Sequence, residues 1–148
     1  MKKDAFSDPK VMTAPEAITN EQKVMRIFEY FGKGDIQSIV DMCSDDCDFL
    51  HGGDAIIPFA KPFKGKKGAA QFFQTIAQNI DVSKIVPSNF KVKPNEISHD
   101  FYVEATAKAT GRPYSVTALY QWVFDQNGKI CRHRSTGDFS KVEAAFRA

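Results

Sequence analysis

The sequence lacks any long apolar run: nowhere do about 18 apolar residues follow one another, as a membrane-spanning helix requires. An excess of one charge is also missing, because 20 basic side chains are matched by 18 acidic ones and the net charge is +2. A dedicated nucleic-acid-binding protein needs a strongly basic surface, so this balance argues against nucleic acid as a partner. The composition favours an ordinary globular protein, with neither a membrane nor nucleic acid as its partner.

Cysteine is scarce, and three residues of it in a chain of 148 do not suit a framework of disulfide bonds. An export signal is lacking too, because Lys2 and Lys3 are followed by Asp4, Ser7 and Asp8 instead of an apolar core. Together these absences predict a reducing, cytoplasmic location.

Internal repeats and low-complexity segments are absent, and the length is that of one domain. Residues 1–18 contain two prolines and little apolar periodicity, so we interpret them as an N-terminal tail. The single domain is expected to occupy residues 19–148.

Apolar residues spaced three and four apart predict helices in the first half of the chain. Thr19 and Gln22 can form a capping box at the start of the first helix, and Asp35 can cap the second. We expect these helices over residues 19–32, 35–43 and 69–80.

The second half alternates apolar and polar side chains, which is typical of strands. Along residues 114–124 this alternation places Tyr120 and Trp122 on one face, which we expect to point inward. Helices followed by hairpin-linked strands indicate the α+β class, with helices on one face of a curved antiparallel sheet. We expect strands over 47–51, 90–97, 101–110, 114–124 and 129–139, turns at 98–100, 111–113 and 125–128, and a last helix over 140–146.

Five short motifs carry a family resemblance: Gly34-Asp35-Ile36, Ser44-Asp45-Asp46-Cys47, Phe63-Lys64-Gly65-Lys66, Trp122-Val123-Phe124 and Asn127-Gly128-Lys129-Ile130. In combination they resemble the nuclear transport factor 2-like superfamily, and within it the ketosteroid isomerases and SnoaL-like polyketide cyclases. The resemblance covers about residues 20–146. It implies a conical fold, the cystatin-like α+β barrel, in which a strongly curved antiparallel sheet wraps around a long helix, with two further N-terminal helices. Because this superfamily includes enzymes and carriers, it implies a fold more directly than a function.

The resemblance to ketosteroid isomerases places His51 at the catalytic base, Tyr120 at the protonated aspartic acid and Ile27 at the oxyanion-binding tyrosine. All three identities differ, which argues against steroid isomerisation. Histidine can still accept a proton near neutral pH, and a tyrosine hydroxyl stays protonated and can donate. The resemblance to SnoaL-like cyclases also implies an acid/base role for Asp138, although strand alternation turns Asp138 outward unless Gly137 forms a bulge.

We therefore expect His51 and Tyr120 to face one cavity that binds a small apolar molecule without a cofactor. The other residues expected to line this cavity are Ile27, Phe28, Trp122 and His133.

Simpler interpretations stay open. His51 can be a half-buried histidine bonded to the loop backbone, and the aromatic residues can be ordinary core. Spacing also allows a zinc site, although a strand would scatter its ligands, and we predict no metal. The zinc alternative uses Cys43, Cys47, His51, Cys131 and His133. A basic cluster is either a solvated rim or a site for an acidic partner; it consists of Lys61, Lys64, Lys66 and Lys67.

Two functions remain compatible with the sequence. The first is a cofactor-independent isomerase, cyclase or related lyase that acts by general acid–base chemistry on a small apolar carbonyl compound. The second is a non-catalytic module that binds a small molecule or a protein. Leu119 and Val123, on the outer face of the strand over 114–124, also predict a homodimer through the sheet.

Overall fold

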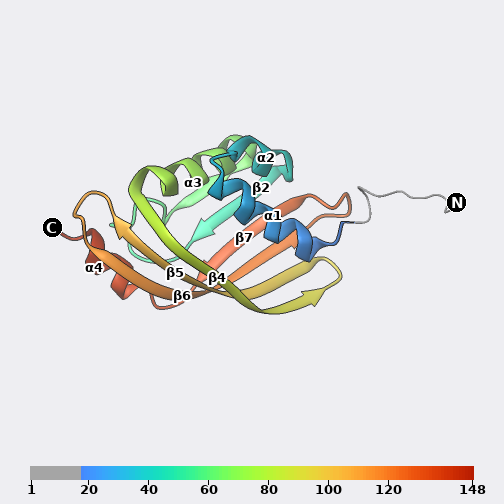
Figure 1. The fold of residues 1–148 in the computed structure, drawn as a ribbon. Helices are drawn as coiled ribbons and strands as arrows, with labels where there is room; N and C mark the ends of the chain where they lie inside the picture. The colour runs from blue at the N-terminus through green and yellow to red at the C-terminus, as the bar shows by residue number, and fades with distance from the viewer. Residues whose placement is uncertain (1–17) are drawn as a thin grey trace, which may run out of the picture.

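The computed structural model describes residues 18–148, so all but the last residue of the predicted tail lies outside the described part of the chain. Helices come first and most strands follow, as the sequence predicts for the α+β class (Figure 1). The elements are α1 (Asn20–Gly32), α2 (Ile36–Asp41), β2 (Cys43–His51), β3 (Pro62–Lys64), α3 (Gly65–Asn79), β4 (Ile80–Lys93), β5 (Glu96–Ala107), β6 (Pro113–Phe124), β7 (Ile130–Thr136) and α4 (Ser140–Phe146).

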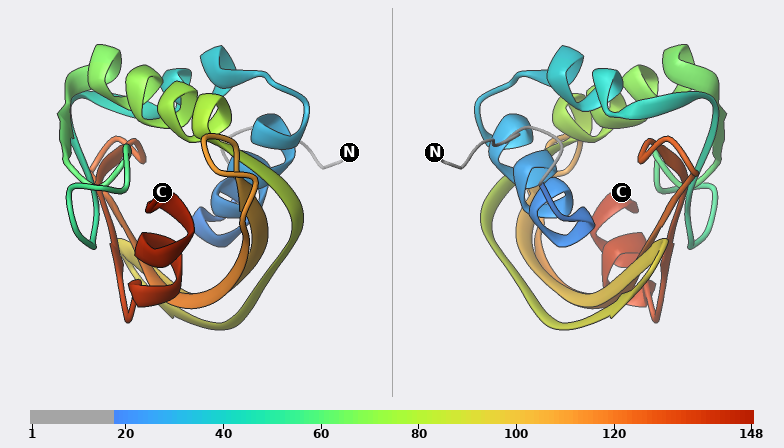
Figure 2. Two further views of the ribbon diagram at one scale, coloured as in Figure 1. Left: turned by 90° about the vertical axis from the view of Figure 1, so that its left-hand side faces the viewer. Right: turned by 90° about the vertical axis from the view of Figure 1, so that its right-hand side faces the viewer.

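The six strands form one strongly curved sheet in the order β3-β2-β7-β6-β5-β4. Figure 2 shows α1, α3 and α4 on its concave side. The predicted conical α+β fold is confirmed, with two corrections. The sheet is not closed, because β3 and β4 leave two edges, and it is not wholly antiparallel, because β2 pairs in parallel with β7. Parallel neighbours need a long connection, which here comprises β3, α3 and the β4–β6 meander.

Local signals in the sequence start the first two helices. Thr19 Oγ1 accepts a hydrogen bond from the Gln22 amide at 3.1 Å, and Gln22 Oε1 accepts one from the Thr19 amide at 2.9 Å, so the predicted capping box is confirmed. Asp35 Oδ1 accepts from the Ser38 amide at 3.2 Å and starts α2. The inward face of α1 buries Val24 and Ile27 against the sheet.

The predicted turn at residues 98–100 is wrong. β5 runs through this segment without a break, and the chain turns at residues 94–95 between β4 and β5. Ile97, His99 and Phe101 are buried and alternate with half-buried polar neighbours, so the segment keeps the two-residue period of a strand. Three successive polar residues favoured a turn locally, but the inward position of His99 gives its polar atoms partners inside the fold.

Smaller differences concern the ends of elements. β2 begins at Cys43, so Ser44, Asp45 and Asp46 belong to the strand, where its register with β7 shifts. β4 extends back to Ile80, far before the predicted start at residue 90, and β7 ends at Thr136.

The inward-facing residues of β6 form the centre of the core, as the alternation predicts. Trp122 and Phe124 are fully buried together with Phe49 of β2. Within residues 18–148, no helix has the length and apolar composition needed to cross a membrane.

Candidate functional site

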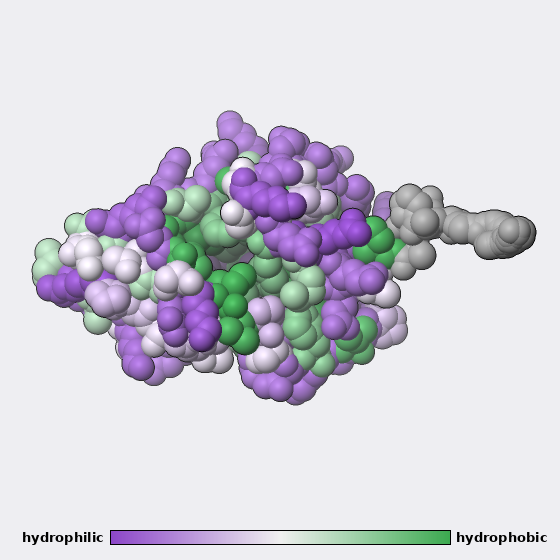
Figure 3. Space-filling model, in the orientation of Figure 1, coloured by the Kyte–Doolittle hydropathy of each residue, from purple (hydrophilic) through white to green (hydrophobic). Residues whose placement is uncertain are grey.

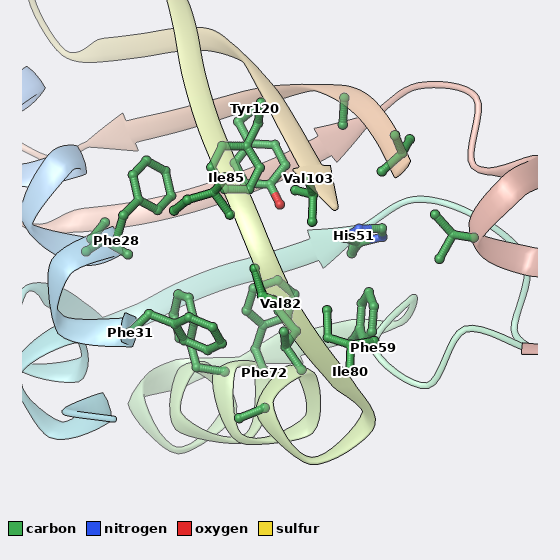
Figure 4. Close-up of a pocket in the computed structure, with 18 of the residues that line it drawn as sticks. Phe28, Phe31, His51, Phe59, Phe72, Ile80, Val82, Ile85, Val103 and Tyr120 are labelled. Carbon is green, nitrogen blue, oxygen red and sulfur yellow. The ribbon is translucent and has the colours of Figure 1, made fainter. Parts of the chain in front are cut away.

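A pocket of about 490 Å³ lies between the concave face of the sheet and helices α1 and α3. Its walls are mainly aromatic and aliphatic, which suits a small apolar ligand. Figure 4 shows Phe28 and Phe31 of α1 on one side, Phe72 of α3 below, and His51 and Phe59 on the other side.

The pocket opens beside the edge strand β4. Val82 and Ile85 line the pocket and are also 41% and 37% exposed. In the space-filling view of this face, hydrophobic residues border a hollow near its centre (Figure 3). An apolar molecule can therefore reach the interior past an apolar rim.

A row of polar side chains crosses four neighbouring strands at one level of the sheet. In the strand register, His51 of β2 pairs with Ser135 of β7, Ser135 with Tyr120 of β6, and Tyr120 with His99 of β5. We call these four residues the polar row. His133 of β7 and Trp122 of β6 pair in the next inward-facing row.

His51 is a neutral imidazole with one free nitrogen. Its Nδ1 lies 2.7 Å from the Gly52 carbonyl oxygen, and because a carbonyl can only accept, Nδ1 carries the proton. The ring packs between Phe59 and Phe139, with centroid distances of 4.9 and 4.6 Å. This burial lowers the pKa of His51 to about 4. Nε2 has no hydrogen-bond partner among the described residues, so it offers a lone pair to the pocket that His51 lines.

Tyr120 supplies the matching donor. Its ring stacks on Phe101 at 4.4 Å and meets His133 edge-on at 5.0 Å. Burial raises the pKa of the Tyr120 hydroxyl, so the group stays protonated at neutral pH. Figure 4 shows the hydroxyl oxygen directed into the pocket, where it has no hydrogen-bond partner from residues 18–148.

His133 lines the same pocket and is 1% exposed. Its Nδ1 donates to the Gln121 carbonyl oxygen at 3.1 Å, and its ring centroid lies 4.0 Å from that of Trp122. Burial holds the pKa of His133 well below its ordinary value, and the neighbouring His51 lowers it further. His133 is therefore a second neutral imidazole in the wall of the pocket.

His99 is the member of the polar row that sequence reasoning missed, because it was assigned to a turn. Its Nδ1 donates to the Asp100 carbonyl oxygen at 2.8 Å, and its Nε2 accepts from Trp122 Nε1 at 3.1 Å. Both ring nitrogens are satisfied, so His99 fixes the Trp122 indole and does not face the pocket. The alternation of Ile97, His99 and Phe101 was the signal in the sequence that could have located it.

The Ser135 hydroxyl is the one buried side-chain polar atom in residues 18–148 without a hydrogen-bond partner. A buried hydroxyl without a partner costs about 1–3 kcal/mol. We predict that Ser135→Ala raises the free energy of unfolding by about 1 kcal/mol, measured by urea denaturation. The exposed neighbour Thr136 provides the control, because Thr136→Ala should change this free energy by less than about 0.5 kcal/mol. A loss of stability in Ser135→Ala would contradict the prediction.

The structure places six of the seven predicted site residues around the pocket: Ile27, Phe28, His51, Tyr120, Trp122 and His133. Asp138 is the exception and needs correction. It is exposed, lies beyond the end of β7 and accepts a hydrogen bond from the Ser140 amide at 3.0 Å, at the start of α4. This bond lowers the pKa of Asp138, and the side chain does not line the pocket.

The alternative sites are not assembled in the described residues. No three potential metal ligands converge anywhere in residues 18–148. Burial raises the pKa of the Cys43 thiol to about 12, and its Sγ donates to the Ile39 carbonyl at 3.4 Å. In the basic cluster, Lys64 and Lys66 lie 3.5 and 4.0 Å from aspartates, and none of the four lysines lines the pocket.

Comparisons with known proteins agree with this architecture. A family model described as SnoaL-like domain matches residues 24–133. Among solved structures, an NTF2-like protein from Burkholderia xenovorans LB400 has a TM-score of 0.78 and 19% identity, over 86% of this chain and 95% of that chain. TerC co-crystallised with polyporic acid has a TM-score of 0.72 and 16% identity, over 87% and 98% of the two chains.

A Mycobacterium tuberculosis protein in complex with estradiol-17β-hemisuccinate has a TM-score of 0.61 and 20% identity, over 80% of this chain and 93% of that chain. No curated protein sequence matches the chain. At such low identities the similar structures establish the fold.

Proposed function

Because the chain belongs to the SnoaL-like domain family, we propose that it is a cofactor-independent isomerase, cyclase or related lyase acting on a small apolar carbonyl compound. The observation that carries the proposal is the presence, in one apolar pocket, of an unprotonated His51 Nε2 and a protonated Tyr120 hydroxyl, neither of which has a hydrogen-bond partner among residues 18–148. These are the two groups that enolisation requires, a proton acceptor and a donor to oxygen.

In the proposed reaction, Tyr120 donates a hydrogen bond to the carbonyl oxygen of the substrate. His51 Nε2 takes a proton from the adjacent carbon, the electron pair of that C–H bond forms a new carbon–carbon double bond, and the oxygen takes up the negative charge. In a substrate whose enolate is conjugated to a further carbon–carbon double bond, the imidazolium then returns its proton to the far carbon of that system. The double bonds shift, the oxygen electrons re-form the carbonyl, and the isomerisation is complete. Aromatic walls exclude water and strengthen both interactions.

Small-molecule binding has separate support. Two proteins of similar structure were determined with small molecules, polyporic acid and estradiol-17β-hemisuccinate. A volume of about 490 Å³ lies within the range of about 300–1,000 Å³ that is usual for ligand pockets.

Two measurements test the proposal. Native mass spectrometry of the freshly purified protein should detect a co-purifying small molecule. As a defined probe we choose 2-tetralone, an aromatic ketone with exchangeable protons next to its carbonyl. In D₂O the protein should accelerate their exchange for deuterium, followed by NMR. If 2-tetralone binds without accelerated exchange, the catalytic assignment is wrong.

A second candidate, a non-catalytic binding module, is favoured by one observation. A pKa of about 4 makes His51 a weak base, because the best general bases have a pKa near the working pH. Binding of 2-tetralone without exchange is the result this candidate expects.

We also propose that two copies associate through the outer face of the sheet. Leu119 is 43% exposed there, and Val123 on the same face is half-buried. We predict that sedimentation velocity shows a dimer at tens of micromolar. Leu119→Arg should shift the equilibrium toward the monomer, because the substitution places a charge in an apolar contact. A monomeric parent protein would contradict the dimer. The cytoplasmic location stays a prediction.

A further inference from the structure

The second free imidazole in the pocket suggests what else the substrate carries. We propose that the substrate bears, besides its carbonyl, a neutral hydroxyl group, a phenol or an enol, which donates a hydrogen bond to Nε2 of His133. His133 would then be the residue that determines specificity. This inference rests on the proposed function, since it concerns a ligand of the same pocket.

The protonation pattern of His133 follows from its contacts. Nδ1 lies 3.1 Å from the Gln121 carbonyl oxygen, which can only accept, so the proton of the neutral ring is on Nδ1. Nε2 is then an acceptor. None of the hydrogen bonds that His133 makes within residues 18–148 involves Nε2. His99 differs, because its Nε2 accepts from Trp122.

His133 Nε2 is open to the pocket. Among residues 18–148, Ser135 Oγ is the one fully buried side-chain polar atom without a hydrogen-bond partner. Nε2 of His133 also lacks such a partner, so it is not fully buried and retains some accessible surface. His133 lines the pocket and is otherwise enclosed by Phe49, Phe72 and Trp122, so that surface faces the pocket.

Packing alone does not account for a histidine here. A phenylalanine would fill the same space among aromatic rings without burying a lone pair that has lost its water. A ligand that brings a donor removes this cost, and a ligand without one leaves it in place. Sites built to bond a hydroxyl therefore reject analogues that lack it.

The charge of the donor is also restricted. An ammonium group would find no carboxylate deep in the pocket, because Asp81, the one carboxylate among the described residues that line it, lies on the exposed edge strand β4. A carboxylic acid is ionised at neutral pH, so its oxygens can only accept hydrogen bonds and cannot donate one to Nε2 of His133. An uncharged O–H group fits the site, with Tyr120 left to bond the carbonyl.

The test uses 2-tetralones hydroxylated at each ring position, each paired with its methyl ether, and measures binding by calorimetry. We expect at least one hydroxyl compound to bind about tenfold or more tightly than its ether. His133→Asn keeps a donor for the Gln121 carbonyl but removes Nε2, so the preference should fall to about twofold or less. His133→Gln places an amide group near the position of Nε2 and should restore part of the preference for the hydroxyl compound.

Thr136→Ala is the control, because Thr136 is exposed at the end of the same strand, lies outside the pocket, and its variant should keep the preference. Equal binding of every hydroxyl and ether pair overturns the inference but leaves the proposed function standing. Failure of all the tetralones to bind overturns both. Independently of any variant, long-range ¹H–¹⁵N spectra should show the proton of His133 on Nδ1, and a proton on Nε2 would overturn the inference.

Discussion

Replacing His51 with asparagine should lower the rate of 2-tetralone proton exchange by about 10²–10⁴, the usual contribution of a general base. The asparagine amide can still donate to the Gly52 carbonyl that His51 Nδ1 bonds at 2.7 Å, so the local backbone keeps its partner. What disappears is Nε2, the proposed proton acceptor. Initial exchange rates by NMR, at equal protein concentration, measure the effect.

The companion variant Tyr120→Phe should lower the same rate by about 10²–10³, the usual cost of removing one donor to a developing oxyanion. The Tyr120 hydroxyl has no partner within the described chain, so its loss should leave the melting temperature within a few degrees. A rate within about twofold of the parent in both variants would show that the pair is not catalytic. Unchanged binding of 2-tetralone in that case would favour the non-catalytic candidate.

The position of His51 and Tyr120 in one pocket could be predicted because the family resemblance pointed to both residues and strand alternation supported Tyr120. Alternation along residues 114–124 fixed the inward face that carries Tyr120 and Trp122, and both line the pocket. Asp138 was placed by resemblance alone, against the alternation of its own strand. The structure follows the alternation and leaves Asp138 exposed at the start of α4.

Long-range partners explain what the sequence did not predict. Ser98-His99-Asp100 reads as a turn because three successive polar residues have no reason to be buried locally. His99 is buried because Trp122, 23 residues away in the chain, donates to its Nε2. The early start of β4 has the same cause: its residues are largely exposed, and pairing with β5 holds them in a strand.

The sequence also could not predict that the pocket presents hydrogen-bond acceptors. Which ring nitrogen of a histidine is free depends on the partner of the other nitrogen. For His51 that partner is the carbonyl of the next residue, and for His133 it is the Gln121 carbonyl on the neighbouring strand. Only the folded backbone determines both.

The same buried histidines should make the protein lose stability in mild acid. The pKa of all three histidines is lowered in the folded state, to about 4 for His51, because burial disfavours the charged ring. In the unfolded chain each has its ordinary pKa of about 6.5. Between these values the unfolded state binds protons that the folded state does not, so stability is complete above about pH 6.5 and falls as the pH drops toward 4.

His51 alone should account for a loss of about 3 kcal/mol across this range, because each pKa unit corresponds to about 1.4 kcal/mol. The lowered pKa values of His99 and His133 act in the same direction, so the total loss is large against a typical stability of about 5–15 kcal/mol. Asp48 acts at lower pH. The pKa of Asp48 is lowered by its hydrogen bond with Arg134, so its contribution is lost only below its unfolded pKa of 3.8.

Urea unfolding between pH 7.5 and about 4.5 measures this dependence, and the number of protons taken up follows from the slope. His51→Asn should reduce the uptake by about one proton, because the variant has no ring to protonate in the unfolded chain. A free energy of unfolding that stays level from pH 7 to about 5 would mean that the histidines are solvated in the folded protein. It would also remove the desolvated imidazoles from which both the acid–base proposal and the hydroxyl preference are argued.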